Sequence, residues 1–531
     1  MDNQNPSSNE FSRRDVIMGM AALLAAASVP ALLAGCGGGG GGGVTGINNN
    51  PNQPNQPPAN YSLPIDGGAL AVNTYDYYNQ GDPAGIHDAI AKAGSLGFKR
   101  IRLVLHWDDV TNSADGTNYS LANFAAQLQE VVQAGLEPNI VFTTTKSKGD
   151  DSLFANGINP WPQTDAQIVK YAADYVYVVQ NLQSYLGNQY KFSIGFEPNG
   201  ALAPNDTAGA KTYAKLFVAV GEAINASNLP LGYLQGPSVT LFQGRERTMT
   251  ATDFNNIFNK AQIKLANGAL AIAANYTDED ALDGYNPSNS IKDSAEGTPE
   301  ENIQNVLNVM KQSGGKPMVM TEVGWTTYNG VNGVTEQRQA IMTIRSILTY
   351  LSLQEPSTRA TLKTITIYEL RDRLGQFPPN ADSPEQLEFG LYNQDWSPKL
   401  AATVLANFQS QFAGYSVGAN TLVHPDRNAK HWEVQLYNPS NSQSIYARWT
   451  SDDNELTNSA YPQAPVFGTK DAKGNFTPLA QQPFPLADFP NSVARPAARA
   501  MSRGHGRTSA KDHAKTALAH PPKPLGLQLA A

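Results

Sequence analysis

KFSIGFEPNG, at residues 191–200, begins with a mostly apolar run that ends in a carboxylate, Glu197. A short apolar run of this kind favours a buried strand, so Glu197 is expected where the strand ends. KPMVMTEVGW, at 316–325, repeats the pattern and places Glu322 at the end of a second run. A carboxylate adds little to packing but is a versatile catalytic group. What the pair can do therefore depends on how the fold relates the two strand ends.

Apolar runs alternate with amphipathic helical stretches from about residue 65 to residue 412. Strands are expected at 69–75, 99–105, 137–143, 191–197, 232–238, 269–275, 316–322 and 364–370. Helices are expected at 84–97, 120–135, 164–186, 207–224, 252–265, 299–313, 335–351 and 398–412. Eight strand–helix repeats predict an α/β fold of the (β/α)8 TIM barrel type. A doubly wound sheet is the alternative, but DYYNQGDPAG (76–85) does not match the glycine-rich phosphate-binding turn that usually follows its first strand.

In a (β/α)8 barrel the active site lies at the carboxyl-terminal ends of the strands, which is where both glutamates are expected. Two carboxylates that share one site suit glycoside hydrolysis. One, in its protonated form, gives a proton to the leaving oxygen, and the other, in its ionised form, attacks the anomeric carbon or activates water. A carboxyl separation of roughly 5 Å permits direct attack with retention of configuration, whereas a wider gap admits water and gives inversion.

Several segments resemble glycoside hydrolase clan A, a group of retaining (β/α)8 enzymes. GFEPNG (195–200) is similar to the strand-4 motif G-N-E-P-N-G, and TEVGW (321–325) is similar to the strand-7 motif T-E-x-G-W. The resemblance covers about 65–412, and the β-rich region that follows favours enzymes like family 39. It implies that Glu197 is the acid/base and Glu322 the nucleophile of an enzyme that acts on a β-linked poly- or oligosaccharide.

Phe196 departs from the clan pattern. The clan typically has asparagine at this position, where its side chain hydrogen-bonds the 2-hydroxyl of the sugar, and phenylalanine has no group that can make this bond. Because that bond strengthens in the transition state, its loss puts the substrate and the rate in question. Either the substrate is bound differently, another residue supplies the bond, or activity is reduced.

The remaining substrate-binding candidates flank the expected strand ends, and they are Arg102, Trp107, Asn199, Tyr276, Trp325 and Glu369. The resemblance implies that Arg102, in GFKRIRLVLHWDDV (97–110), supports the nucleophile.

Each of the other candidates also has a structural interpretation. Tyr276 lies near the nucleophile or packs at the rim, and Trp325 stacks on a sugar or belongs to the core. Glu369 contacts sugar or forms a salt bridge, and Asn199 binds substrate or holds its loop. Trp107 is expected near the cleft.

The N-terminal residues are typical of an export signal and not of a folded domain. Arg13 and Arg14 precede an apolar run, which resembles a twin-arginine signal. The run ends in LLAGC (32–36), which resembles a lipobox, so Cys36 is the expected lipidation site and membrane anchor. A plain signal or a transmembrane anchor is the alternative. The localisation expected is a membrane-anchored lipoprotein that faces the periplasm or the cell surface.

Composition divides the chain into five parts. These are an export signal with lipobox (1–36), a flexible Gly/Asn/Pro tether (37–64), the catalytic barrel (65–414), a β-sandwich-like domain (415–490) and a basic disordered tail (491–531). The tail is expected to be solvated, with contact to anionic lipid or polysaccharide as the alternative.

Charge and composition limit the partners. The formal net charge of −8 gives no basis for binding nucleic acid, and the seven histidines show no metal-ligand spacing, so neither a cofactor nor a metal is expected. Two other functions stay open beside the hydrolase. One is a non-catalytic carbohydrate-binding surface lipoprotein, which Phe196 would suit. The other is a transglycosylase, which would use the same residues. The oligomeric state is left open.

Overall fold

The structure is a computed structural model, and its described elements belong to one compact unit, Met1–Val493. The described residues are 61–74, 85–110, 121–144, 161–186, 191–229, 234–241, 248–285, 298–328, 333–373, 387–425, 428, 430–452 and 462–485. The predicted export signal with Cys36, most of the predicted tether and the predicted basic tail lie outside them. Within the described part of the chain, no helix combines the length and apolarity needed to cross a membrane.

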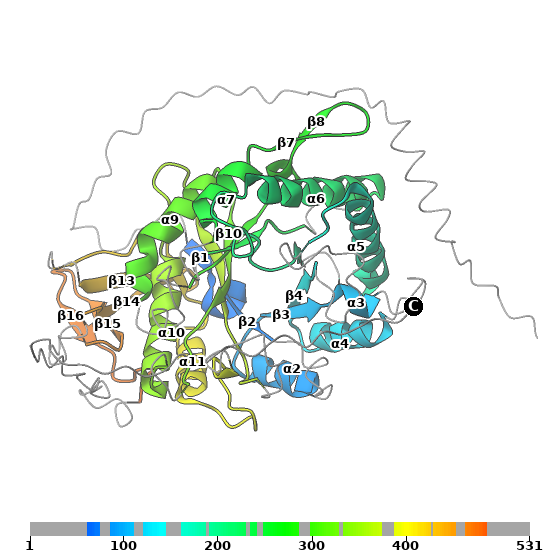
Figure 1. Cartoon of the computed structure of the whole chain (residues 1–531). Helices are drawn as coiled ribbons and strands as arrows, with labels where there is room; N and C mark the ends of the chain where they lie inside the picture. The colour runs from blue at the N-terminus through cyan, green and yellow to red at the C-terminus, as the bar shows by residue number, and fades with distance from the viewer. Residues whose placement is uncertain are drawn as a thin grey trace, which may run out of the picture. The chain divides into compact units, whose positions relative to one another are not determined.

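Eight parallel strands form the barrel, as predicted (Figure 1). They are β2 (Leu70–Asn73), β3 (Arg100–Leu105), β4 (Glu137–Phe142), β5 (Lys191–Ile194), β6 (Ser238–Thr240), β9 (Asp280–Asp283), β10 (Met318–Val323) and β11 (Leu362–Ile367). Their spatial order is β5-β4-β3-β2-β11-β10-β9-β6, and a parallel bridge links Phe192 of β5 to Leu234, which precedes β6. All carboxyl ends of the strands therefore meet at one mouth.

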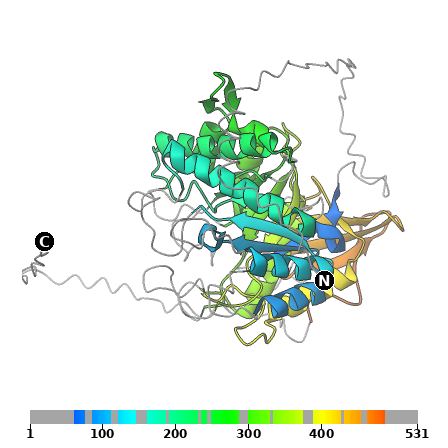
Figure 2. The same ribbon diagram turned by 90° about the vertical axis from the view of Figure 1, so that its right-hand side faces the viewer.

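Helices surround the strands in both views (Figures 1 and 2). They are α2 (Gly85–Ser95), α3 (Trp107–Val110), α4 (Ala122–Gln133), α5 (Asp165–Leu186), α6 (Thr207–Ala226), α7 (Ala251–Phe258), α9 (Ile303–Gln312), α10 (Glu336–Leu351) and α11 (Leu400–Gln411). Several of these helices begin after a residue whose side chain accepts a hydrogen bond from a backbone amide of the first turn. Asp206 accepts from the amide of Gly209 at α6, and Thr335 accepts from that of Arg338 at α10.

The sixth barrel strand is not the one that the sequence predicts. The predicted strand 269–275 instead contains β8 (Leu270–Ile272), which pairs antiparallel with β7 (Gln262–Lys264) in a hairpin that projects from the top of both views (Figures 1 and 2). The barrel uses β9, which includes two aspartates. The apolar sequence of 269–275 looked more like a buried strand, but the paired hairpin satisfies its backbone hydrogen bonds outside the barrel.

A six-stranded antiparallel sheet follows the barrel, as the sequence predicts. Its order is β1 (Tyr61–Pro64), β12 (Ser416–Gly418), β13 (His431–Asn438), β14 (Gln443–Thr450), β15 (Val466–Lys470) and β16 (Phe476–Pro478). The edge strand β1 comes from residues that the sequence assigned to the tether. The described strands form one sheet, and Phe467 of β15 packs its ring on α11, 5.8 Å from that of Phe408.

Candidate active site

Glu322 lies near the carboxyl end of β10, where donors from β2, β3 and the segment after β9 meet its carboxylate. Arg102 of β3 donates from Nη1 to Oε1 of Glu322 at 2.5 Å and to the carbonyl of Thr321 at 3.1 Å. Nδ2 of Asn73, the last residue of β2, donates to the same carboxylate oxygen at 3.4 Å. The hydroxyl of Tyr285, just after β9, donates to Oε2 at 3.2 Å. These contacts fix the orientation of the carboxylate.

Glu197 lies just beyond β5 in a loop with an unusual backbone. Its φ of 37° is positive, and Gly195 two residues earlier has a φ of 64°. A non-glycine residue in such a conformation costs roughly 1–3 kcal/mol and persists only where its surroundings enforce it. The sequence predicted that the strand would continue to Glu197, but the turn ends it at Ile194.

Asn199 helps to hold the backbone of the Glu197 loop in this conformation. Its Nδ2 donates to the carbonyls of Thr240 at 2.9 Å and Met249 at 3.1 Å, and its Oδ1 accepts from the amide of Thr240 at 2.8 Å. The side chain is 1% exposed. Of the two interpretations of Asn199, the structure favours the loop hydrogen bond, because these contacts tie the Glu197 loop to β6.

The two glutamates interact electrostatically. The pKa of Glu197 is raised to about 7. Burial is the largest cause and the nearby charge of Glu322 acts in the same direction, while a hydrogen bond from the side chain of Thr240 and the charge of Arg102 oppose the increase. An acid with a pKa near neutrality has both protonation states accessible, which suits a group that donates a proton and later takes one back.

A third carboxyl, that of Asp283 at the end of β9, is fully buried beside this pair. It accepts hydrogen bonds from the hydroxyls of Ser238 at 2.9 Å and Thr321 at 2.6 Å. Burial raises its pKa well above the usual range, and the charges of Glu322 and Glu197 act in the same direction. Burial disfavours the charged form of Asp283, and the two hydroxyl donors offset part of that cost.

An aromatic group flanks the Glu322 side of the site. The ring of Tyr285 lies 6.2 Å from that of Tyr368, which follows β11, and 6.3 Å from that of Phe389. Tyr368 and Phe389 contact each other edge to face at 5.5 Å. Aromatic faces of this kind are suited to contact the C–H surface of a sugar.

Glu369 is 1% exposed and pairs with Arg373, whose Nε donates to Oε1 at 3.1 Å. Burial raises the pKa of Glu369 well above its usual range, and the charges of Asp372 and Glu322 add to the increase. The structure thus shows the salt-bridge role for Glu369. The guanidinium of Arg373 also lies over the ring of Tyr368, 5.4 Å from its centroid, and so links Glu369 to the aromatic group.

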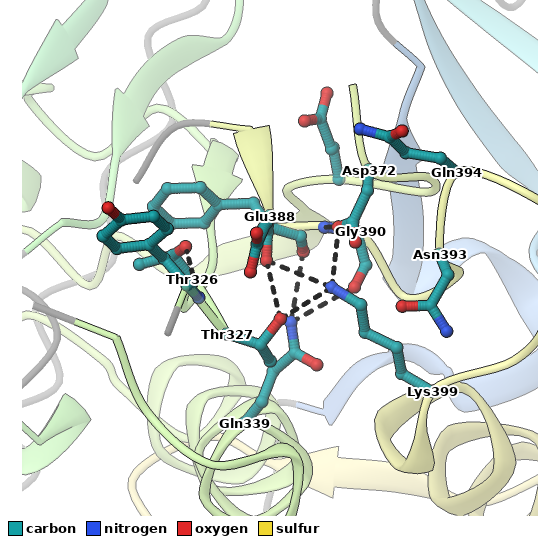
Figure 3. Close-up of polar contacts among 12 residues, drawn as sticks. Thr326, Thr327, Gln339, Asp372, Glu388, Gly390, Asn393, Gln394 and Lys399 are labelled. Atoms are coloured by element: carbon teal, nitrogen blue, oxygen red, sulfur yellow. Dashed lines mark hydrogen bonds and ion pairs between the residues drawn. The ribbon is translucent and has the colours of Figure 1, made fainter. Parts of the chain in front are cut away.

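A buried polar cluster around Lys399 supports the loops behind these residues (Figure 3). Lys399 donates from Nζ to Oδ1 of Asp372 at 2.6 Å, to the hydroxyl of Thr327 at 2.8 Å and to the carbonyl of Glu388 at 3.2 Å. The same Asp372 oxygen accepts from the amide of Gly390 at 2.8 Å. The cluster ties the loop after β10 to the loop after β11, which carries Glu369.

Trp325 follows β10 and is 6% exposed. Nε2 of Gln339 on α10 donates to its carbonyl at 2.9 Å, and the indole Nε1 has no hydrogen-bond partner among the described residues. Burial to this degree favours the core interpretation of Trp325 over an open stacking face.

Trp107 does not lie open to the site. Its side chain is fully buried, its Nε1 donates to Oδ2 of Asp174 on α5 at 2.8 Å, and its ring packs edge to face on Tyr171 at 5.0 Å. The expectation that Trp107 binds substrate is therefore wrong. The ring instead joins α3 to α5, because the chain turns outward from the barrel directly after β3.

Tyr276 is also misplaced by the sequence prediction. It belongs to the short helix η3 (Ala273–Tyr276), which precedes β9, so it lies at the opposite end of the barrel from Glu322. Its hydroxyl donates to Oε1 of Glu222 on α6 at 2.6 Å. Tyr285 occupies the position beside Glu322 that the sequence prediction assigned to Tyr276, and the error follows from the misassigned sixth strand.

Sequence reasoning also missed Asn73, Asp283 and Tyr368. Each one ends or directly follows a barrel strand, so correct strand boundaries would have identified them. Among the described residues, no group of three or more His, Cys, Asp or Glu side chains is arranged to hold a metal ion.

Comparison with solved structures shows the fold at low sequence identity. The chain is similar to a family 39 glycoside hydrolase from the gut symbiont Bacteroides cellulosilyticus WH2, with a TM-score of 0.50 and 16% identity over 80% of each chain. It is also similar to a monomeric beta-xylosidase from Caulobacter crescentus CB15, with a TM-score of 0.47 and 15% identity over 75% of this chain and 77% of that one. No protein-family model matches the chain, and the search of curated proteins finds no match.

Proposed function

We propose that the protein is a retaining glycoside hydrolase that cleaves a β-linked poly- or oligosaccharide by double displacement. The observation that carries the proposal is the pairing of Glu197, whose pKa burial raises to about 7, with Glu322, whose Oε1 accepts a 2.5 Å hydrogen bond from Arg102. One carboxyl is suited to donate a proton and the other is oriented to attack, as the two steps of the reaction require.

In the first step, Oε2 or Oε1 of Glu322 attacks the anomeric carbon while Glu197 gives its proton to the leaving oxygen. The bond to the leaving group breaks, and a glycosyl ester of Glu322 forms. Arg102 and Tyr285 hold the carboxylate on opposite oxygens, so that little reorganisation is needed as its charge is consumed.

In the second step, ionised Glu197 takes a proton from water, whose oxygen attacks the anomeric carbon. The ester bond to Glu322 breaks, the sugar leaves with its original configuration, and Glu197 is protonated again. A transglycosylase would differ only in the acceptor, since a sugar hydroxyl would replace water.

The direct test replaces Glu322 with alanine and follows hydrolysis of aryl β-glycosides and β-glycans. We expect hydrolysis to fall by at least about 10⁴-fold, and added azide to restore turnover as a glycosyl azide of inverted configuration. Glu130, which pairs with His87 on the outer helices, provides the matched control Glu130→Ala. Product analysis separates hydrolysis from transglycosylation. Wild-type rates for Glu322→Ala would contradict the assignment.

A non-catalytic carbohydrate-binding role is the second candidate, and the exposed ring of Phe196 beside Glu197 favours it. A protein that only binds carbohydrate does not need two carboxyl groups held in this way, which argues against this role. Saturable binding of glycans by the wild type without turnover of any glycan or aryl glycoside would establish this second role.

We propose further that the chain is exported by a twin-arginine-type signal and anchored through a lipid on Cys36, facing the periplasm or the cell surface. The support is the order of the paired arginines, the apolar run and LLAGC at 32–36. Replacing Cys36 with alanine should move the protein from the membrane fraction to the soluble fraction. A membrane-bound Cys36→Ala variant would contradict lipid anchoring at this residue.

A further inference from the structure

Phe196 presents an apolar ring at the catalytic end of the barrel. At 36% exposure it is the most exposed phenylalanine among the described residues, although it directly precedes Glu197. Its ring faces the guanidinium of Arg102, with the carbon Cζ 5.3 Å from the ring centroid. Since Arg102 also holds Glu322, the ring lies next to both groups that the proposed reaction uses.

The backbone on each side of Phe196 limits where the ring can go. Gly195 and Glu197 both have positive φ, and a Cβ at Gly195 would lie 3.0 Å from the hydroxyl of Thr144. Asn199 fastens the following residues to β6. The exposed ring is therefore part of a fixed turn.

The ring also shields polar atoms. Nε and Nη2 of Arg102 are buried and have no hydrogen-bond partner among the described residues. A ring over a guanidinium makes a favourable cation–π contact, but it leaves only C–H groups and a π face for an incoming ligand. A sugar hydroxyl placed against Phe196 would lose water without gaining a partner, whereas an apolar group there would lose nothing.

We propose that the sugar bound beside Glu197 presents an apolar group to Phe196, namely a deoxy carbon or a methyl group, and not a free hydroxyl. This inference rests on the proposed glycosidase function, since it assumes that a sugar occupies the site. The substituents nearest the anomeric carbon are those on the carbon next to it and on the far side of the ring oxygen. The substrate class is accordingly a deoxy or methylated glycoside.

The experiment compares matched p-nitrophenyl β-glycosides that differ in one group. The pairs are glucoside and 2-deoxyglucoside, galactoside and its 6-deoxy analogue D-fucoside, and glucoside and its 2-O-methyl ether. Each kcat/KM is divided by the spontaneous hydrolysis rate of the same compound, because 2-deoxyglycosides are intrinsically more reactive. Titration calorimetry with the corresponding free sugars gives a binding readout that needs no turnover.

Wild type is expected to favour the apolar member of at least one pair by about 10- to 100-fold. Phe196→Asn, which supplies a donor and an acceptor, should reverse this preference, and Phe196→Leu, which keeps an apolar side chain, should preserve its direction. An unchanged melting temperature shows that each variant is folded.

Preference of the wild type for the free hydroxyl in every pair, with no change in Phe196→Asn, would overturn the inference. So would the absence of binding of all the sugars. Selective binding of the apolar sugars without hydrolysis would support the inference while contradicting the proposed catalytic function. Hydrolysis that is lost in Glu322→Ala but is unaffected by replacing Phe196 would support the proposed catalytic function and contradict the inference.

Discussion

Arg102 donates from Nη1 to Oε1 of Glu322 at 2.5 Å, and the two side chains are only 1% and 11% exposed. The contact joins β3 to β10 across the barrel mouth. A charge-assisted hydrogen bond in such an environment is stronger than in water, and breaking it leaves a buried charge without its partner. It is therefore the contact through which the barrel most directly orients the proposed nucleophile.

Replacing Arg102 with lysine should lower kcat/KM by about 100- to 1,000-fold, because a single ammonium cannot reproduce the directed donation of a guanidinium. Arg100→Lys is the matched control. Arg100 lies on the same strand but donates to Glu137 and Thr364, away from Glu322, so its replacement should change kcat/KM little. Equal losses in the two variants would show that the effect is structural.

Replacing Tyr285 with phenylalanine removes the hydrogen bond to Oε2 of Glu322 and leaves the ring. A hydrogen bond to a charged group contributes about 1.5–3 kcal/mol, so kcat/KM should fall roughly 10- to 100-fold. Tyr276→Phe removes the bond to Glu222 at the other end of the barrel and should leave kcat/KM unchanged. Loss of activity in Tyr276→Phe alone would contradict the placement of both tyrosines.

The raised pKa of Glu197 predicts how activity depends on pH. Burial raises this pKa to about 7, and the first step needs the protonated acid, so kcat/KM should decrease as pH rises through about 7. In the wild type this decrease should be much weaker for dinitrophenyl glycosides, whose leaving group needs no proton. Glu197→Gln should slow glycosides with poor leaving groups far more than dinitrophenyl glycosides, and should remove the decrease above about pH 7. An unaltered basic limb in Glu197→Gln would mean that another group titrates there.

A buried ion pair connects the barrel to the antiparallel sheet and should govern stability. Glu300 accepts from Nε of Arg345 at 2.9 Å and from Nε1 of Trp449 on β14 at 2.6 Å. Glu300→Gln leaves the Arg345 charge buried without a counter-charge, which should cost about 3–5 kcal/mol and lower the melting temperature. Asp165→Asn, in the exposed pair with Lys215, is the control and should have almost no effect. A melting temperature equal to that of wild type would contradict this role.

The barrel was predictable because seven of its eight strands coincide with or overlap apolar runs bounded by helical stretches. Glu197 and Glu322 were found for the same reason, since a carboxylate at the end of such a run is conspicuous. Arg102 was found only through the resemblance of GFKRIRLVLHWDDV (97–110) to clan A. β9 escaped detection because DALD at 280–283 is short and carries two aspartates, whose burial depends on hydroxyls from other strands.

The errors at Tyr276 and Trp107 have physical causes that one sequence does not reveal. The strand at 269–275 has the composition of a barrel strand but pairs with 262–264, and this displaced Tyr276 to the wrong end of the barrel. Trp107 follows β3, where a cleft residue was expected, but its indole is buried and donates a hydrogen bond to Asp174, which is far along the chain.

Covalent trapping tests the central claim, which is that Glu322 is the nucleophile, most directly. A dinitrophenyl 2-deoxy-2-fluoro-β-glycoside slows the breakdown of a glycosyl-enzyme more than its formation, so the intermediate accumulates and peptide mass spectrometry locates it. We predict one fluorosugar per molecule on the peptide that contains Glu322, and none when Glu322 is replaced with alanine. Attachment to any other residue, or active hydrolysis without a trapped ester, would contradict the account.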